Sequence, residues 1–243
     1  MPIIKLNAID STNSYLRGLI GAKVVEDFTV VTAKHQTNGR GQRGSTWMSE
    51  PSKNLMFSVF IDVSSMKLDF PFYLSMATAL AIRKSLYSFL IPQLHIKWPN
   101  DILSHHKKIC GVLIENVIKQ GEVSASIIGI GINVNQTDFE DLPNASSLKN
   151  ISGKFFDLDE VLNGILVNLK HYITLLRKSK FQQILDEYNT HLFRKNKPST
   201  FRDIEGNMFS GYIQNVSETG DLQVLLEDNI IKSYELKEVS LLY

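Results

Sequence analysis

The chain has 243 residues, of which 43% are hydrophobic, so it can form one large domain with a sizeable core and a small second domain. Its 26 basic and 25 acidic residues leave a formal net charge of +1, which excludes the positive field that gathers nucleic acid non-specifically. The single cysteine, Cys110, excludes an intramolecular disulfide and a cysteine-based zinc site, and no run of about 18 apolar residues is long enough to span a membrane. We therefore expect a cytoplasmic protein with no nucleic-acid or membrane partner.

Strands and helices are predicted to alternate along most of the chain. Stretches rich in β-branched and apolar residues predict strands at residues 2–9, 28–34, 55–62, 95–98, 109–117 and 123–134. Apolar residues at helical spacing predict helices from residues 11–13 to about 20 and at 70–90, 158–176 and 181–193, with caps at 11–13 and 157. Residues 119–122 form the predicted hairpin turn and 137–150 a polar loop. The pattern predicts a mixed sheet with helices that cover it.

A change of pattern near residue 195 predicts a domain boundary. The charged run 194–198 ends in a proline, and short strands follow, separated by turn residues at 205–207, 220–221 and 228–229. We therefore divide the chain into a first domain, residues 1–195, and a small β-barrel, residues 196–243. Because so few residues can hardly fill an independent core, the barrel is expected to dock on the larger domain.

The segment 39–47, GRGQRGSTW, is the first candidate for a binding site. Its glycines let backbone N–H groups converge on one point, and its arginines offer planar forks for phosphate or carboxylate. Trp47 adds a flat face for a base. Taken alone, such a segment can equally be an exposed turn with solvated arginines.

Two further polar clusters lie at the ends of predicted strands. The first is KWPND, residues 97–101, with Lys108 seven residues after Asp101; the second is GIGINV, residues 129–134. Loops at strand ends commonly carry ligand-binding groups. Three such endings in one domain predict a single shared site.

The motifs GRGQRGSTW, KWPND, KKICG and IGIGINVN, preceded by Asp10 to Asn13, resemble those of biotin protein ligases, in the same order. The resemblance covers residues 1 to roughly 190 by motif. It implies an α+β fold: a mixed β-sheet catalytic domain covered by helices, of the class II synthetase-like biotin/lipoate ligase type, with a C-terminal SH3-like β-barrel. The chain enters its first strand at once, so we expect the short form of the family, without an N-terminal DNA-binding domain.

The resemblance implies an ATP-dependent ligase. Biotin is activated as biotinyl-5'-AMP, with Mg²⁺ accompanying ATP, and is then transferred to a lysine of a biotin carboxyl carrier protein, a subunit of acetyl-CoA carboxylase or a similar carboxylase. A carboxylate is ionised near neutral pH and needs no base, so the first step mainly requires two anions to be brought together. Positive charge must overcome their repulsion.

The resemblance also assigns roles to individual residues of this sequence. The implied catalytic residues are Lys108, Arg40, Arg43, Lys97 and Asp101. The implied biotin-binding residues are Ser11, Thr12, Asn13, Gln36, Gly39, Arg40, Gly41, Gln42, Lys108, Gly111 and Gly129. The implied ATP and adenylate-binding residues are Arg40, Gln42, Arg43, Trp47, Lys108 and Asn133. No dedicated metal ligands are expected, because Mg²⁺ usually binds mainly through the ATP phosphates.

Several assignments leave alternatives open. Asp101 can orient Lys97 or Lys108, bind magnesium through water, or hold the incoming amine. Residues 11–13 can be a plain helix cap, although a cap is compatible with ligand contact. The glycines at 111, 129 and 131 can admit either a ligand or another part of the chain, and in these motifs we favour the ligand. Side chains that we expect to lie outside the chemistry are Trp98, in the core, and Lys107, His105 and His106, at the surface.

One position departs from the family pattern. The family's glycine-rich loop often reads Gly-Arg-Gly-Arg, and here the fourth position is Gln42. Glutamine can donate hydrogen bonds but neutralises no charge, so we expect a looser grip on the adenylate.

Three other functions compete with the ligase. A lipoate or octanoate ligase or transferase shares the fold type but carries a different loop, and a biotin or nucleotide sensor would have lost turnover. A structural or interaction module is suggested only by the C-terminal strands at 212–216 and 222–226. A homodimer is a further expectation, because family members often pair through sheet edges.

Overall fold

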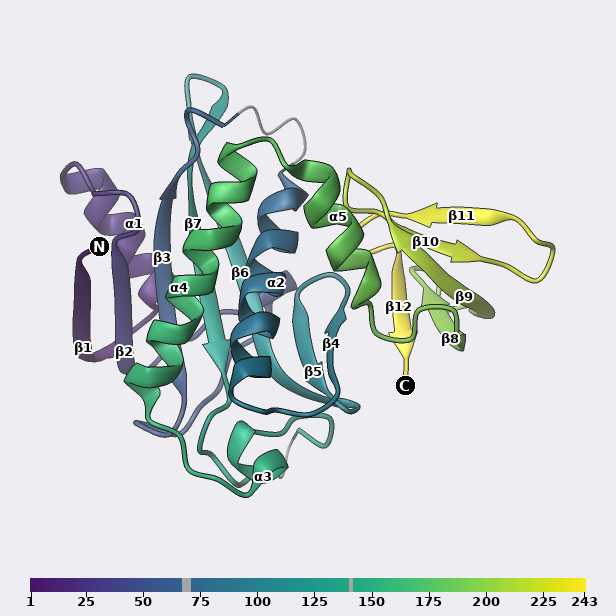
Figure 1. Cartoon of the computed structure of the whole chain (residues 1–243), viewed down its shortest axis with the longest axis horizontal. Coiled ribbons are helices and arrows are strands. Elements are labelled where there is room, and N and C mark those ends of the chain that lie inside the picture. The colour runs from purple at the N-terminus through teal and green to yellow at the C-terminus, as the bar shows by residue number, and fades with distance from the viewer. Residues whose placement is uncertain (67–70, 140–141) are drawn as a thin grey trace.

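Two β-sheets form the frame of the protein (Figure 1). The computed structural model describes residues 1–66, 71–139 and 142–243, with the side chain of Arg43 also outside the description. The first part of the chain forms β1 (Ile3–Ile9), α1 (Thr12–Ala22), β2 (Val30–Gln36), a 3₁₀ turn η1 (Gln42–Gly44), β3 (Leu55–Asp62), α2 (Phe72–Ser88), β4 (Leu94–Lys97), β5 (Asp101–Ser104), β6 (Lys107–Lys119) and β7 (Glu122–Ile132). The second part forms α3 (Leu148–Ser152), α4 (Leu158–Arg177), α5 (Phe181–Thr190), β8 (Pro198–Asp203), β9 (Met208–Val216), β10 (Leu222–Leu225), β11 (Ile231–Tyr234) and β12 (Val239–Leu242).

The larger sheet has seven strands in the order β1-β2-β3-β7-β6-β5-β4. The pair β1 and β2 is parallel, because α1 forms the crossover between them, and the other pairs are antiparallel. Gln120 and Gly121 form the hairpin turn between β6 and β7, with φ of 53° and 85°, as a two-residue turn with left-handed backbone requires. The predicted mixed sheet is confirmed.

Helices cover the two faces of this sheet unequally. On one face, α2 and α4 pack together over the main core, which includes Phe57 and Val59 of β3. On the other face, Leu16 of α1 packs against Val31 and Phe60 in a smaller core. Because successive side chains of a strand point to opposite faces, β3 is buried on both. Helix α1 covers only part of the second face, and the rest of that face can form a binding site.

Element boundaries differ from the prediction in a few places. The short strand β5 and the one-turn helix α3 were not predicted; α3 begins in the predicted polar loop, where the hydroxyl of Ser147 accepts from the N–H of Asn150. Helix α5 ends at Thr190, earlier than predicted, and β7 ends at Ile132. The predicted start of the second helix at residue 70 lies outside the described residues. Asp157 caps α4 as predicted, accepting from the N–H of Glu160 at 2.9 Å.

The C-terminal strands form a five-stranded antiparallel sheet in the order β11-β10-β9-β8-β12. Within the described residues β11 does not pair with β12, so the predicted barrel is an open sheet here. Trp98 Nε1 donates to the carbonyl of Gly220 at 2.8 Å, and Asn189 exchanges two hydrogen bonds with the backbone of Val216. One hydrophobic core runs through both sheets. The small sheet is therefore docked on the larger one, whereas a domain boundary at 195/196 stays a prediction.

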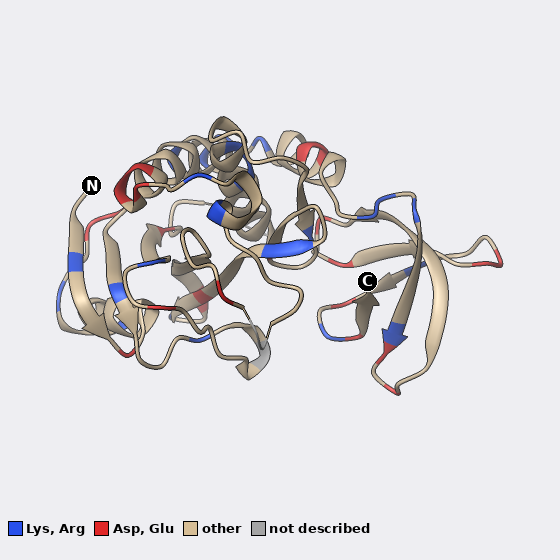
Figure 2. Cartoon of the chain, turned by 90° about the horizontal axis from the view of Figure 1, so that it is seen from below, with Lys and Arg blue, Asp and Glu red and all other residues tan. Residues whose placement is uncertain are grey.

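Figure 2 shows basic and acidic residues interspersed over both sheets, in line with the net charge of +1. In the parts of the chain that the structure describes, no helix is both long and apolar enough to cross a membrane.

Candidate active site

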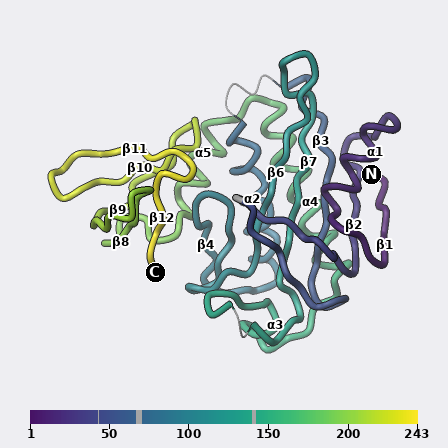
Figure 3. Tube along the Cα trace, turned by 180° about the vertical axis from the view of Figure 1, so that it is seen from behind, coloured from purple at the N-terminus to yellow at the C-terminus, as the bar shows by residue number. Residues whose placement is uncertain are grey.

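A cavity of about 290 Å³ lies on the face of the large sheet that carries α1. The segment between β2 and β3, which contains GRGQRGSTW, crosses this face (Figure 3). The C-terminal sheet closes one side of the cavity through Ile213, Leu222, Val239, Ser240 and Leu241. The three sequence motifs and the second sheet thus meet at one place.

The floor of the cavity is a row of residues that runs across four neighbouring strands. Gly131 of β7 pairs with Gly111 of β6, Gly111 with Asp101 of β5, and Asp101 with Lys97 of β4. Directly paired residues share one face of a sheet. At one end of the row, the shallow end, the two glycines carry no side chains. At the other end, the charged end, lie Asp101 and Lys97.

Trp47 lies on the shallow end. A Cβ atom at Gly131 would approach Trp47 Cε2 to 2.5 Å, and one at Gly111 would approach Trp47 Cζ3 to 3.1 Å. The two glycines thus admit the indole, so the close approach that we expected for a ligand is made here by a side chain of the site. Trp47 Nε1 is buried and has no hydrogen-bond partner among the described residues, which leaves it free for a ligand acceptor.

Neutral polar side chains gather at the start of α1. The side-chain amide oxygen of Gln36, Oε1, accepts from the N–H and the hydroxyl of Thr12, at 2.8 and 3.0 Å. The Ser58 hydroxyl lies 2.5 Å from Asn13 Oδ1, and the Asn13 amide donates to Glu115 at 2.7 Å. A Cβ at Gly129 would approach Asn13 Oδ1 to 2.5 Å, so this glycine makes room for Asn13.

Ser11 occupies the N-cap position of α1, as predicted, but its side chain makes no capping hydrogen bond. Its backbone N–H instead donates to Asp10 at 2.6 Å, and the residue is buried in the cavity wall. Because the hydroxyl is not used by the helix, it remains available to a ligand.

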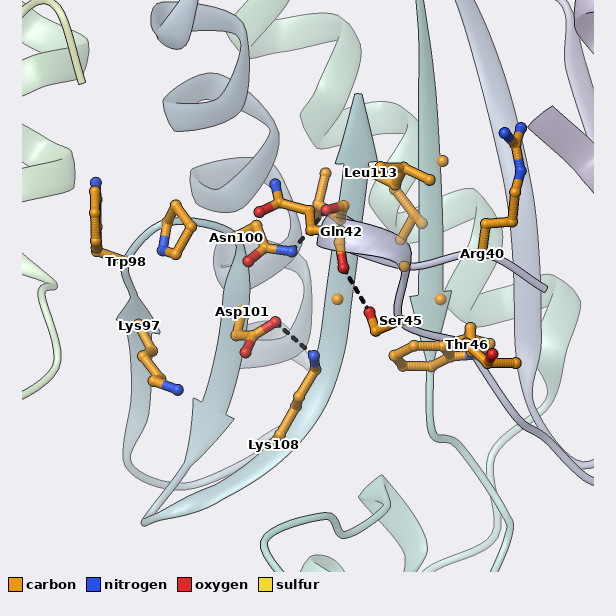
Figure 4. Close-up of a pocket in the computed structure, with 18 of the residues that line it drawn as sticks. Arg40, Gln42, Ser45, Thr46, Lys97, Trp98, Asn100, Asp101, Lys108 and Leu113 are labelled. Atoms are coloured by element: carbon orange, nitrogen blue, oxygen red, sulfur yellow. Dashed lines mark hydrogen bonds and ion pairs between the residues drawn. The ribbon is translucent and has the colours of Figure 1, made fainter. Parts of the chain in front are cut away.

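Two lysines, Lys97 and Lys108, lie near one carboxylate, Asp101, at the charged end of the row (Figure 4). Lys108 Nζ lies 2.7 Å from Asp101 Oδ1, and the Asp101 side chain is only 13% exposed. The pKa of Lys97 is lowered by burial and by Lys108, and Asp101 partly opposes this effect. Among the roles left open for Asp101, this geometry favours the orientation of Lys108. It also leaves a net positive charge where an anion can bind.

Arg40 points away from this cluster (Figure 4). Its guanidinium lies 3.1 Å from Glu115 Oε2 and 3.3 Å from the Ser14 hydroxyl, and Arg17 is also within 3.6 Å of Glu115. Arg40 therefore lines the cavity but is paired within the protein, and its predicted contact with an anion requires it to leave Glu115. Arg43 was assigned a catalytic role, and its side chain lies outside the description.

The remaining predicted residues divide between the cavity and its surroundings. Gly41 and Gln42 line the cavity, and the Gln42 carbonyl accepts from the hydroxyl of Ser45 at 2.7 Å. Gly39 lies behind, where a Cβ would meet the Trp47 carbonyl oxygen at 2.4 Å. Asn133 is buried outside the lining, and its amide donates to the Ser146 carbonyl at 3.0 Å. Its predicted contact with adenine stays a prediction.

Four side chains were expected to lie outside the chemistry. Trp98 is 9% exposed and belongs to the main core as predicted, but it also lines the cavity. His105 and His106 lie in the exposed turn between β5 and β6. Lys107 is exposed, and its ammonium donates to the Pro143 carbonyl.

Sequence reasoning missed several residues that shape the site. Ser58 and Glu115 are polar positions inside otherwise apolar strands, LMFSVFID and GVLIENV, and that interruption was the available signal. No such signal marked the C-terminal residues that line the cavity, because apolar side chains in a strand can equally belong to the hydrophobic core.

No group of three or more His, Cys, Asp and Glu side chains in the described ranges is placed to hold a metal ion. Asp101, the acidic residue of the cavity lining, is already paired with Lys108.

Known proteins share the sequence motifs and the fold that form this cavity. Residues 6–133, which carry the GRGQRGSTW, KWPND and KKICG motifs, match the model of the biotin/lipoate A/B protein ligase family. The chain belongs to this family. Over its whole length it resembles the biotin protein ligase of Aquifex aeolicus in complex with biotin and ATP, with a TM-score of 0.84, 27% identity, and 99% of this chain and 98% of that chain covered.

Two curated relatives are similar in sequence. The biotin--[acetyl-CoA-carboxylase] ligase of Mycobacterium tuberculosis is 32% identical over 181 residues, 72% of this chain and 65% of the relative. The bifunctional ligase/repressor BirA of Bacillus spizizenii is 34% identical over 172 residues, 68% of this chain and 51% of the relative. The chain thus spans about half to two thirds of the length of these relatives.

Proposed function

We propose that the protein is an ATP-dependent ligase that joins biotin to AMP and then transfers biotin to a lysine of a biotin carboxyl carrier protein. One observation carries the proposal: a single cavity places a neutral polar cluster, an aromatic face and a lysine pair next to one another. Family membership and the likeness to ligases whose names include biotin support it. The activity, the substrates and the partner remain our proposal.

The neutral cluster suits the ureido ring of biotin. The ring carries N–H donors and a carbonyl acceptor, and Ser11, Thr12 and Asn13 offer both kinds of group in a largely buried wall. Gln36 is oriented by its bonds to Thr12. The carboxylate of biotin would then point along the row of paired residues towards Lys108.

The charged end suits the phosphates of ATP. In the first step a carboxylate oxygen of biotin bonds to the α-phosphorus, and the bond to the pyrophosphate oxygen breaks. Lys108 neutralises the oxygens on which negative charge gathers, and Asp101 holds the Lys108 ammonium in place. Lys97 adds a second positive charge, and the face of Trp47 is available to adenine.

In the second step the neutral amine of the acceptor lysine bonds to the biotinyl carbonyl carbon. The bond from that carbon to the phosphate oxygen breaks, AMP leaves with the electron pair, and the nitrogen loses a proton to solvent. The carbonyl oxygen gains negative charge during the attack, and Lys108 lies at the junction where that oxygen would be held. The same lysine therefore serves both steps.

Mg²⁺ would enter with ATP and neutralise charge on its phosphates. The cavity lining fits this mode, because its one carboxylate, Asp101, is engaged with Lys108 and the phosphates themselves can supply the ligands. The chain's own residues bind and orient the substrates.

Three further expectations complete the proposal. The acceptor is a protein and not a nucleic acid, in keeping with a net charge of +1. The reaction takes place in the cytoplasm, where ATP is available. A homodimer is compatible with β1, which is an edge of the large sheet.

The test is the intact mass of a biotin carrier domain after incubation with the protein, biotin, ATP and magnesium. We expect a gain equal to one biotinyl group, dependent on ATP and absent from a carrier whose target lysine is replaced. Biotin binding without a gain would favour a sensor, and preferential binding of lipoate would favour the lipoate-type activity.

The replacement Gln42→Arg should slow release of the adenylate by about 10-fold, because it adds a charge-assisted contact at the cavity wall. The release rate is measured by chasing labelled biotinyl-AMP with unlabelled compound. An unchanged rate would show that Gln42 does not contact the intermediate. Gln223→Arg, on β10 and away from the lining, is the matched control.

A further inference from the structure

The ring of Tyr243, directly after β12, faces the ammonium of Lys97. Lys97 Nζ lies 4.6 Å from the ring centroid, within the range of a cation–π interaction. The ring also packs against Phe193, whose centroid is 5.2 Å away in an edge-to-face arrangement. The C-terminal sheet thus reaches a charged residue of the candidate active site.

We propose that Tyr243 is a positioning residue that holds the Lys97 ammonium at the phosphate end of the cavity. The inference rests on the proposed function, since it assigns Lys97 to the triphosphate of ATP. It makes the second sheet a determinant of ATP affinity.

The charge balance of the cluster explains why Lys97 needs such a partner. Two lysines lie near one carboxylate, and that carboxylate, Asp101, is paired with Lys108 at 2.7 Å. No carboxylate in the described part of the chain lies within 4 Å of Lys97 Nζ. Burial lowers the pKa of Lys97 and Lys108 adds to this effect, while Asp101 opposes it only in part. The π face of Tyr243 therefore adds a direct contact to the more distant attraction of Asp101.

The aromatic face, and not the hydroxyl, carries this role. Burial and the nearby Asp101 raise the pKa of Tyr243, so the phenol stays neutral and offers no negative oxygen to Lys97. Phenylalanine presents a similar quadrupole, whereas leucine fills comparable space without one. The two replacements therefore separate the π contact from packing.

The test compares KM for ATP and kcat in biotin-dependent exchange of labelled pyrophosphate into ATP, together with ATP binding by calorimetry. We expect Tyr243→Leu to raise KM and Kd for ATP about 3- to 30-fold with little change in kcat, the range of a cation–π contact. Tyr243→Phe should restore both constants to near the wild-type values. Tyr212→Leu is the matched control, because Tyr212 lies on the same sheet and is 41% exposed, against 38% for Tyr243.

A double-variant cycle tests whether the effect passes through Lys97. Once Lys97→Met has removed the ammonium, Tyr243→Leu should add no further loss of ATP affinity. Additive losses, equal losses in Tyr243→Phe, or unchanged ATP constants in Tyr243→Leu would overturn the inference. Wild-type protein that binds ATP without exchange would count against the proposed ligase, and the calorimetric comparison would still decide the role of Tyr243.

Discussion

Lys108→Ala should reduce kcat of biotin-dependent pyrophosphate exchange by about 100- to 1,000-fold, the loss typical when a charge stabiliser of a transition state is removed. The structure gives a second reason for a large effect. Without Lys108 at 2.7 Å, Asp101 would face the incoming anions as an unpaired carboxylate. Biotin affinity, measured by calorimetry, should change much less, because the neutral polar cluster at the start of α1 is intact.

Lys107→Ala is the control for this experiment. Lys107 neighbours Lys108 in sequence and has the same charge, but it is exposed and bonds to the Pro143 carbonyl outside the cavity. Its replacement should leave exchange near the wild-type rate. Comparable rates in Lys107→Ala and Lys108→Ala would contradict the role given to Lys108.

Gly131→Ala should raise KM for ATP by about 10-fold or more, because displacement of a stacking side chain costs a base contact worth about 1–3 kcal/mol. A Cβ at this position would lie 2.5 Å from Trp47 Cε2, so the indole must leave the glycine end of the row. Biotin binding should be retained, because the three atoms nearest to a Cβ at Gly131 all belong to Trp47 and none to the neutral polar cluster. Both constants follow from exchange kinetics and calorimetry.

Two variants make this prediction decisive. Gly18→Ala is the control, since nothing lies within 4 Å of a Cβ there, and in the middle of α1 it should stabilise the fold by about 0.5–1 kcal/mol. Trp47→Ala removes the indole without crowding and should raise KM for ATP to a similar extent. An unchanged KM in Trp47→Ala would mean that adenine binds elsewhere.

Periodicity and motif spacing predicted most of the large sheet and the residues of its row. Each long strand is a run of β-branched and apolar residues. In β3 this run is nearly continuous, because both faces of the strand are covered, and it therefore predicts a strand clearly. The residues of the row were named from the motifs: Lys97 ends β4, Asp101 begins β5, and the glycines lie near the start of β6 and the end of β7. What the sequence did not contain was the register, which pairs Gly111 with both Gly131 and Asp101.

The features that escaped prediction depend on contacts distant in sequence. Strand β5 has only four residues and exists because it pairs on both sides, with β4 and β6. The pairing of Arg40 with Glu115 joins residues that no periodicity relates. The approach of Tyr243 to Lys97 depends on how the second sheet docks, which is decided by contacts such as Trp98 with Gly220.

The shared core has a consequence for any attempt to divide the chain. Ile96 and Trp98 on one side and Ile213 and Val216 on the other are buried together. Fragments cut at the connection between α5 and β8 would each present an apolar face to water, which favours their reassociation. Because the cavity has walls from both fragments, ligand binding would return only with complementation, and the protein could be used as a split reporter.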